Sequence, residues 1–266
     1  MKSCNLNLDF QPVPNTMQKD AYRTKRKESG LTLIELMVAM TIGLFLVAVI
    51  GNLFVGAKQT YRTQDNLARL QENGRFALEL LGRNIRDAGY TNISFAPPAS
   101  KYAAPTAIGF VKPDGTPDIA ITGSNGSPDT ITVSYDAATD CLNAAAPGGR
   151  AVNAFSINAG KQLICLGNGS ATSQVILDDV EDMQIFYGED TDGDQNPNRY
   201  VVAGTAGLVM GNVTAVRLCV LVRSSEDNLA NKEQTYTDCS GSSVTAADKR
   251  IRRTFSATYN LRNRTS

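Results

Sequence analysis

The sequence predicts an α+β protein in which one long N-terminal helix precedes a head of mainly antiparallel β-strands. Residues 33–57 are apolar almost throughout, and residues 67–88 repeat apolar side chains at three- and four-residue spacing, as one face of a helix does. After residue 90, prolines and glycines separate short runs of strand-forming residues. A helix that covers one side of such a sheet defines the α+β class.

Composition narrows the range of functions. The chain of 266 residues has 26 basic and 26 acidic residues, so it offers no overall positive field to nucleic acid. It contains no histidine, which removes Ser-His-Asp and Cys-His catalytic pairs and imidazole metal ligands. We therefore expect neither an enzyme nor a nucleic-acid-binding protein.

The apolar run predicts a membrane-spanning helix. Residues 33–57 contain Glu35 as their only charge, and about 20 apolar residues suffice to cross a bilayer core. A basic cluster at residues 23–27 comes just before the run, which places the N-terminus in the cytoplasm and everything after Lys58 outside it. No small-residue cleavage site of the secretory type follows Ala57.

Residues 30–37, Gly-Leu-Thr-Leu-Ile-Glu-Leu-Met, closely resemble the prepilin signature of type IV pilins and type II secretion pseudopilins. The resemblance implies that prepilin peptidase cuts between Gly30 and Leu31 and that the new amino terminus of Leu31 is N-methylated. Residues 1–30 would then be a cytoplasmic leader, for which Met17 is an alternative start. Leu31 stands where the family most often has phenylalanine.

Glu35 is the one ionisable group that the sequence places in the membrane. A carboxylate there costs about 2–3 kcal/mol on insertion scales, so it needs a partner. In the family the corresponding Glu pairs with the terminal amine of a neighbouring subunit, and the resemblance implies this role in assembly for Glu35. The alternative is a side chain that only reaches the membrane interface.

Residues 58–90 are expected to continue the helix as an amphipathic half. The apolar stripe comprises Leu67, Leu70, Gly74, Ala77, Leu78, Leu81, Ile85 and Ala88. A helix over residues 31–88 would contain about 58 residues and measure roughly 87 Å. Residues 31–57 would form its transmembrane and filament-core half, and residues 91–266 an extracytoplasmic head.

Residues 71–90 are similar to the segment that follows the membrane helix in PilW-type minor pilins, and residues 259–264 resemble their closing strand. The resemblance implies a pilin-like fold, a single pass through the inner membrane with a periplasmic head, and later a place in the pilus fibre or at its tip. The implied functions are priming, assembly or tip formation of type IV pili, and through them twitching motility. The implied partners are prepilin peptidase, other minor pilins, the major pilin, the inner-membrane assembly platform and a large tip adhesin.

Two alternatives stay open at this point. A minor pseudopilin of a type II secretion system would share the whole N-terminal motif. A membrane-anchored periplasmic enzyme or ligand-binding domain would instead keep its N-terminus uncut.

Six strands are predicted in the head, over residues 129–135, 162–166, 174–177, 183–187, 213–223 and 253–261. In the last of them Phe255, Ala257, Tyr259 and Leu261 alternate and share one face. We therefore expect this final strand to bury one side of its sheet.

Four cysteines lie in the head, where an oxidising compartment favours disulfides. Of the three possible pairings we favour the sequential one, Cys141 with Cys165 and Cys219 with Cys239, because each closes a loop around one predicted strand segment. A zinc site is not expected, since both C-x-x-C spacing and histidine are absent.

One acidic loop offers oxygen ligands at alternate positions. Asp190, Asp192, Asp194 and the amide oxygen of Asn196 are candidates to bind calcium, although the spacing is not that of an EF-hand. The alternative is a solvated turn between two strands. No other cofactor is expected.

Two further groups of charges are interpreted as solvated surface. The acidic pairs 178–179 and 181–182 are adjacent in sequence, with nothing to place them across a substrate as a glycosidase requires. The basic run at residues 250–253 is interpreted as an exposed strand edge that resists aggregation rather than as a DNA-binding patch.

Overall fold

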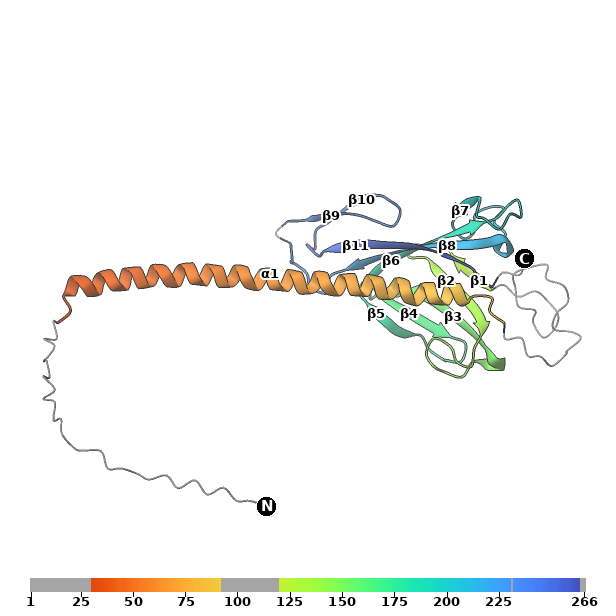
Figure 1. Ribbon diagram of the computed structural model, residues 1–266, viewed down its shortest axis with the longest axis horizontal. Helices are drawn as coiled ribbons and strands as arrows, with labels where there is room; N and C mark the ends of the chain where they lie inside the picture. The colour runs from red at the N-terminus through yellow and green to blue at the C-terminus, as the bar shows by residue number, and fades with distance from the viewer. Residues whose placement is uncertain (1–29, 92–119, 231, 264–266) are drawn as a thin grey trace, which may run out of the picture. The chain divides into compact units, whose positions relative to one another are not determined.

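The computed structural model describes residues 30–91, 120–230 and 232–263 (Figure 1). Apart from Gly30, the predicted leader and its alternative start at Met17 lie outside the described residues. The chain divides into two compact units, residues 1–53 and 54–266, which we describe separately. Helix α1 (Leu33–Asp87) begins in the first unit and ends in the second.

In the first unit, the described residues form the start of α1. Side chains on every side of the helix are exposed, including Leu33 at 78% and Phe45 at 69%. Within the described residues α1 is the one helix long and apolar enough to cross a membrane. An all-round apolar surface of this kind is stable only in lipid or against other proteins.

In the second unit, α1 buries one stripe against the head. The buried positions are Asn66, Leu70, Gly74, Ala77, Leu81, Gly82, Asn84 and Ile85, followed by Ala88. Of the apolar stripe predicted for this half, Leu67 and Leu78 are only half-buried. Gly89 ends the run with a φ of 81°, a conformation that glycine adopts without strain, and its N–H donates to the carbonyl of Ser134.

The head contains two antiparallel sheets rather than the single sheet that we expected. A five-stranded sheet has the order β1-β2-β3-β4-β5. Its strands are β1 (Ile121–Ser124), β2 (Thr130–Asp136), β3 (Arg150–Ile157), β4 (Gln162–Gly167) and β5 (Gln174–Asp178). All of its pairings join strands that are consecutive in sequence, so the sheet is a meander.

The second sheet has four strands in the order β11-β8-β6-β7. They are β6 (Val180–Glu189), β7 (Arg199–Val201), β8 (Val213–Arg223) and β11 (Arg252–Asn260). A separate hairpin pairs β9 (Gln234–Thr237) with β10 (Ser243–Ala246), and short 3₁₀ turns precede β3 and β8. Figure 1 shows the second half of α1 crossing in front of both sheets.

One core joins the helix to both sheets. Leu81 and Ile85 of α1, Phe155 and Leu163 of the first sheet, and Leu218 of the second are each at most 1% exposed and belong to the same cluster. Burying such side chains stabilises by about 1.5–3 kcal/mol each. The helix is therefore part of the head's core.

The six predicted strands all exist, and the strand predicted over residues 213–223 has the bounds of β8. Strands β1, β3, β7, β9 and β10 were not predicted. In β11, Phe255, Ala257 and Tyr259 are more buried than the residues between them, and Leu261 beyond its end is buried, as their alternation predicted.

Two disulfides hold loops of the head. Cys141 is joined to Cys165 of β4, and Cys219 of β8 is joined to Cys239 after the β9 strand. This is the sequential pairing that the sequence favoured. The second bond anchors the β9–β10 hairpin to the central strand of the four-stranded sheet.

Candidate functional site

The predicted cleavage site lies directly before α1. Gly30 and Leu31 are non-helical and exposed, with Leu31 at 80%. A Cβ placed on Gly30 would meet no other atom within 4 Å. The peptide bond between these residues is therefore sterically open, while cleavage and N-methylation at this bond stay predictions.

Thr32 and Glu35 together begin the helix. Glu35 Oε2 accepts hydrogen bonds from the Thr32 backbone N–H and hydroxyl, both at 3.0 Å, and Thr32 Oγ1 accepts one from the Glu35 N–H at 3.3 Å. This reciprocal pair is a capping box, which satisfies two backbone donors that a helix start leaves unpaired. Sequence reasoning missed it, although the Thr-x-x-Glu spacing before an apolar run was its signal. Glu35 thus has a partner within its own chain.

Two aromatic side chains of β11 pack against α1 and so hold the head on the helix. The ring of Phe255 lies against Gly74 and the ring of Tyr259 against Gly82, so closely that a Cβ at either glycine would overlap the ring. The Tyr259 hydroxyl also donates to the Leu78 carbonyl at 2.8 Å. Glycine is required here because any larger residue would push the strand off the helix.

A buried polar network joins the same helix to the five-stranded sheet. The Asn84 side-chain oxygen accepts from the Tyr135 hydroxyl at 3.0 Å and from Asn153 Nδ2 at 3.1 Å. Asn153 is fully buried, and its own side-chain oxygen accepts from the Cys141 N–H. Because buried polar groups are costly when unpaired, this network fixes how the helix, β2, β3 and the first disulfide loop fit together.

A third contact holds the helix nearer its membrane half. Arg62 pairs with Glu226, with Nε 3.0 Å from Oε2, and the Asn66 side-chain oxygen accepts from the Ser225 hydroxyl at 3.2 Å. The loop after β8 therefore contacts α1 at about one and two turns before the first core leucine of the stripe, Leu70.

The basic run at residues 250–253 was interpreted wrongly as a solvated edge. Arg252 is buried and pairs with Asp248 at 2.6 Å and with Glu181 at 2.5 Å, and its guanidinium lies 5.3 Å from the Tyr236 ring centroid. Hydrogen bonds from Arg252 lower the pKa of Asp248 to about 2. Arg250 donates to backbone carbonyls of the loop after β8. Of this run, Arg253 is exposed as expected.

The acidic pairs are likewise tied into the fold. Glu181 pairs with Arg252, and Asp179 pairs with Arg223 at 3.3 Å. These contacts correct their interpretation as merely solvated charges, whereas Asp178 is exposed and accepts from Gln162. The ion-pair partners of Glu181 and Asp179 lie 71 and 44 residues away in sequence. Local spacing therefore did not reveal these two ion pairs.

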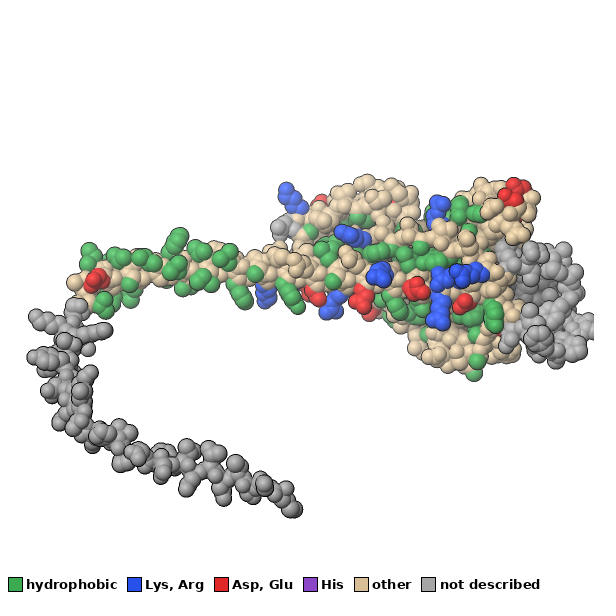
Figure 2. Space-filling view, in the orientation of Figure 1, with side chains coloured by type: hydrophobic (Ala, Val, Ile, Leu, Met, Phe, Trp, Pro, Cys, Tyr) green, Lys and Arg blue, Asp and Glu red, His purple; other side chains and the backbone are tan. Residues whose placement is uncertain are grey.

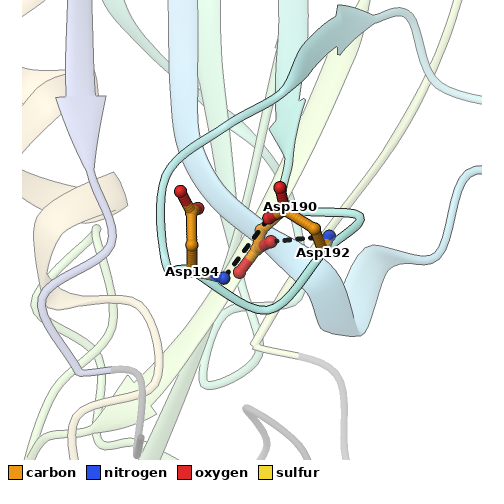
Figure 3. Close-up of side chains that lie close together, drawn as sticks. All are labelled: Asp190, Asp192 and Asp194. Carbon is orange, nitrogen blue, oxygen red and sulfur yellow. Dashed lines mark hydrogen bonds between the residues drawn. The ribbon is translucent and has the colours of Figure 1, made fainter.

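The candidate calcium ligands Asp190, Asp192 and Asp194 do converge. They lie in the loop between β6 and β7, with one carboxylate oxygen from each within 4.8 Å of the others (Figure 3). Asp190 is buried, and its two oxygens accept from the N–H groups of Asp192, Gly193 and Gln195. Burial raises the pKa of Asp190, but these bonds outweigh it and leave the pKa below the ordinary value.

Asn196, the fourth candidate ligand, turns differently from our expectation. Its amide nitrogen lies 3.2 Å from Asp194 Oδ2, so the nitrogen rather than the oxygen faces the carboxylates. The three carboxylates suit a hard cation such as calcium, whereas the loop is also held by its own hydrogen bonds. Calcium binding therefore stays a prediction.

Charged side chains line the exposed face of the second half of α1. Figure 2 shows basic and acidic groups alternating there, and hydrophobic side chains along the first half. Asp65 pairs with Arg69 at 3.0 Å, and Glu79 with Arg86 at 3.5 Å. Such exposed pairs contribute little to stability, about 0–1 kcal/mol, but they keep this face soluble beside the head.

Two family models match the sequence. "Type IV Pilus-assembly protein W" matches residues 152–263, which cover the head from β3 to β11, and "Prokaryotic N-terminal methylation motif" matches residues 25–51. No curated protein matches the sequence.

Solved structures that are similar to the chain at a distance include the following two. One is the type IV-like pilin TTHA1219 from Thermus thermophilus, with 15% identity, 74% of this chain and 98% of that chain covered, and a TM-score of 0.45. The other is a chain of the GspK-GspI-GspJ complex of the type 2 secretion system from enterotoxigenic Escherichia coli, with 11% identity, 70% and 95% covered, and a TM-score of 0.33. Likeness at these scores is too weak to support a functional argument.

The family models match the two regions that the physical description singles out, the start of the apolar helix and the β-rich head. The methylation motif includes the open Gly30–Leu31 bond and the capped Glu35. The head is therefore similar to the type IV pilus-assembly protein W family, and the start of α1 is similar to the prokaryotic N-terminal methylation motif.

Proposed function

We propose that this chain is a minor pilin, which is cut by prepilin peptidase between Gly30 and Leu31 and then takes part in priming, assembly or tip formation of type IV pili. The carrying observation is that one helix combines an all-round apolar first half with a second half buried in the head. The first half suits lipid and then neighbouring helices, and the second half transmits their packing to the head.

Before assembly the chain would cross the inner membrane once, with its N-terminus in the cytoplasm and its head in the periplasm. The basic residues before α1 support this orientation through the positive-inside rule. The two disulfides support an oxidising compartment for the head. Prepilin peptidase, other pilins and the membrane assembly platform are the partners that this function requires.

The mature N-terminus tests the processing step. Mass spectrometry of the chain from cells that contain prepilin peptidase should find N-methylated Leu31 as the first residue. An intact leader on the mature protein would contradict the proposal and favour an uncut membrane anchor. Deletion of the gene should then reduce surface pili and twitching; unchanged pili with lost secretion of exoproteins would assign the chain to a type II secretion system.

The capping box allows the charge of Glu35 to be tested apart from its role in the helix. Gln at this position still accepts the hydrogen bonds of Thr32, so Glu35→Gln keeps the cap and removes the charge. We expect Glu35→Gln to be processed normally and to fail in assembly as Glu35→Val does. If Glu35→Gln assembles and Glu35→Val does not, the cap rather than an intersubunit charge pair is what assembly requires.

A further inference from the structure

Among the described residues, strand β11 forms the longest sheet edge, and β9 lies close to part of this strand. The edges at β1, β5 and β7 are four, five and three residues long, and a bulge interrupts the pairing of β5 with β4. By contrast β11 is nine residues long and pairs with β8 without a register shift. Short strands and bulges are the usual protections of an edge against added strands, and β11 has neither.

The hydrogen-bonding pattern identifies the groups that this edge presents. The Leu261 N–H donates to the Thr214 carbonyl at 2.9 Å, and the Ser224 N–H donates to the Ile251 carbonyl at 2.8 Å. Both pairs continue the β11–β8 register, and such pairs alternate along an antiparallel ladder. Odd-numbered residues of β11 therefore bond to β8, and even-numbered ones direct N–H and C=O away from it.

The outward groups belong to Thr254, Ser256, Thr258 and Asn260, whose side chains are all exposed. Within residues 30–91, 120–230 and 232–263, β11 pairs with β8 alone. A row of such groups spaced two residues apart matches the backbone of another extended chain.

The charges around the edge indicate what kind of strand fits. Residues 254–261 contain no acidic or basic residue and no proline, while Arg253 and Arg262 on either side are exposed. Neither arginine makes an ion pair with an acidic group of the described residues. A complementary strand is neutral along its length and has a carboxylate near one or both ends.

The direction of β11 excludes one kind of partner, a second copy of this chain that pairs its own β11 antiparallel to this edge. Phe255 lies on Gly74 and Tyr259 on Gly82, so β11 runs in the same direction as the second half of α1. Two copies that paired their β11 edges antiparallel would have antiparallel helices, which subunits inserted in one membrane with the same topology do not have. A neighbouring subunit with the same topology would have to present its strand along a helix parallel to α1.

We propose that the β11 edge receives a neutral, acid-ended strand from a neighbouring pilin subunit. The inference rests on the proposed function, because that function supplies neighbours that stand in the same membrane. The added strand would bond to the backbone at Thr254, Ser256, Thr258 and Asn260, and its carboxylates would meet Arg253 or Arg262.

Site-specific photocrosslinking in cells with the complete pilus system tests this. A benzoylphenylalanine at Thr258 of the full-length chain should give an adduct whose second component, identified by peptide mass spectrometry, is a pilin subunit linked through an extended segment. The same probe at Gln174, exposed on the short β5 edge, is the matched control and should give at least tenfold less. An absent adduct, equal adducts at both positions, or a link to the chain's own residues would overturn the proposal.

Two variants separate backbone pairing from other contacts. Ser256→Pro removes one outward N–H and should abolish the Thr258 adduct, whereas Ser256→Val keeps the N–H and should preserve it. Formation of both disulfides reports that each variant folds. Should Ser256→Pro fail to fold, Arg253→Glu takes its place and should lower the adduct severalfold; an unchanged adduct would then contradict the proposal.

The N-terminus is analysed in the same cells. If the chain begins with methyl-Leu31 and pili are normal, but no Thr258 adduct forms, the proposal for the β11 edge is wrong and the proposed function still stands. A chain that retains its leader would overturn both.

Discussion

The two halves of α1 differ in what surrounds them, although both are helix. Around residues 33–57 every face is exposed, and a Cβ at Gly43, Gly51 or Gly56 would meet no other atom within 4 Å. In the second half, Gly74 and Gly82 are each covered by an aromatic ring of β11. The same residue type thus marks open helix surface in one half and a close strand contact in the other, and only the second depends on the head.

Loss of the first disulfide should give the largest effect on the covered half. In the loop-entropy account, a bond between residues 24 apart contributes about 3 kcal/mol. Cys141→Ser with Cys165→Ser should lower the free energy of unfolding of the head by about that much, and more because Cys165 is fully buried. Denaturant unfolding of the full chain in detergent measures it, and retained helicity in the apolar half is the expected contrast.

Substitution of glycine by alanine in each half of α1 compares the two halves directly. At Gly74 or Gly82 a methyl group would overlap a ring, so each substitution should destabilise the head by about 1–3 kcal/mol. At Gly51 the same change meets nothing and should leave the head's stability unchanged. Thermal unfolding distinguishes these cases, and equal effects at Gly51 and Gly82 would abolish the contrast between the halves.

Calcium should stabilise the head alone. With a dissociation constant of about 1 mM, typical of weak extracellular sites, 10 mM calcium would add about 1.4 kcal/mol to the free energy of unfolding. Calorimetry and thermal unfolding with Ca²⁺ and with Mg²⁺ check this. Asp192→Asn with Asp194→Asn removes exposed carboxylates and spares buried Asp190. If calorimetry detects no heat of binding at millimolar calcium, the prediction is wrong.

Asp248 gives the smallest expected effect. Because its pKa falls from 3.8 to about 2 in the folded chain, it contributes stability above pH 4 that is lost as the pH falls toward 2. Its side chain is 38% exposed, so solvent screening holds this contribution to about 1 kcal/mol or less. Asp248→Asn should flatten the acid limb of the stability curve between pH 4 and pH 2; an unchanged limb would show that the ion pair adds nothing.

The spacing of apolar residues in the sequence predicted those elements that bury one continuous apolar face. The helix and strands such as β8 have regular spacing of apolar residues, so their positions followed from the sequence. Strand β3 was missed because its inward positions include Asn153, a polar residue that is buried only because Asn84 and Tyr135 satisfy it. The hairpin β9–β10 was missed because each of its strands has only four residues, one of its faces is wholly polar, and the disulfide at Cys239 holds it.

The candidate site shows the same limit. The Gly30–Leu31 bond and Glu35 lie in a contiguous motif, so the sequence alone suffices to predict them as a site. Arg252 looked solvated because Glu181, its partner, is 71 residues away. Gly74 was assigned to the helix stripe, but the reason for glycine there is Phe255, which only the folded chain brings to it.

The packing of β11 on α1 also determines when the head can complete its folding. The helix face at Gly74 and Gly82 is synthesised early, yet the rings that cover it belong to the last dozen residues of the described chain. Until the C-terminal strand has been synthesised, that face stays uncovered, and chains with such distant contacts fold late. A truncation before Phe255 would therefore leave the head unfinished, and such a chain should be cleaved by proteases more readily than the full-length one.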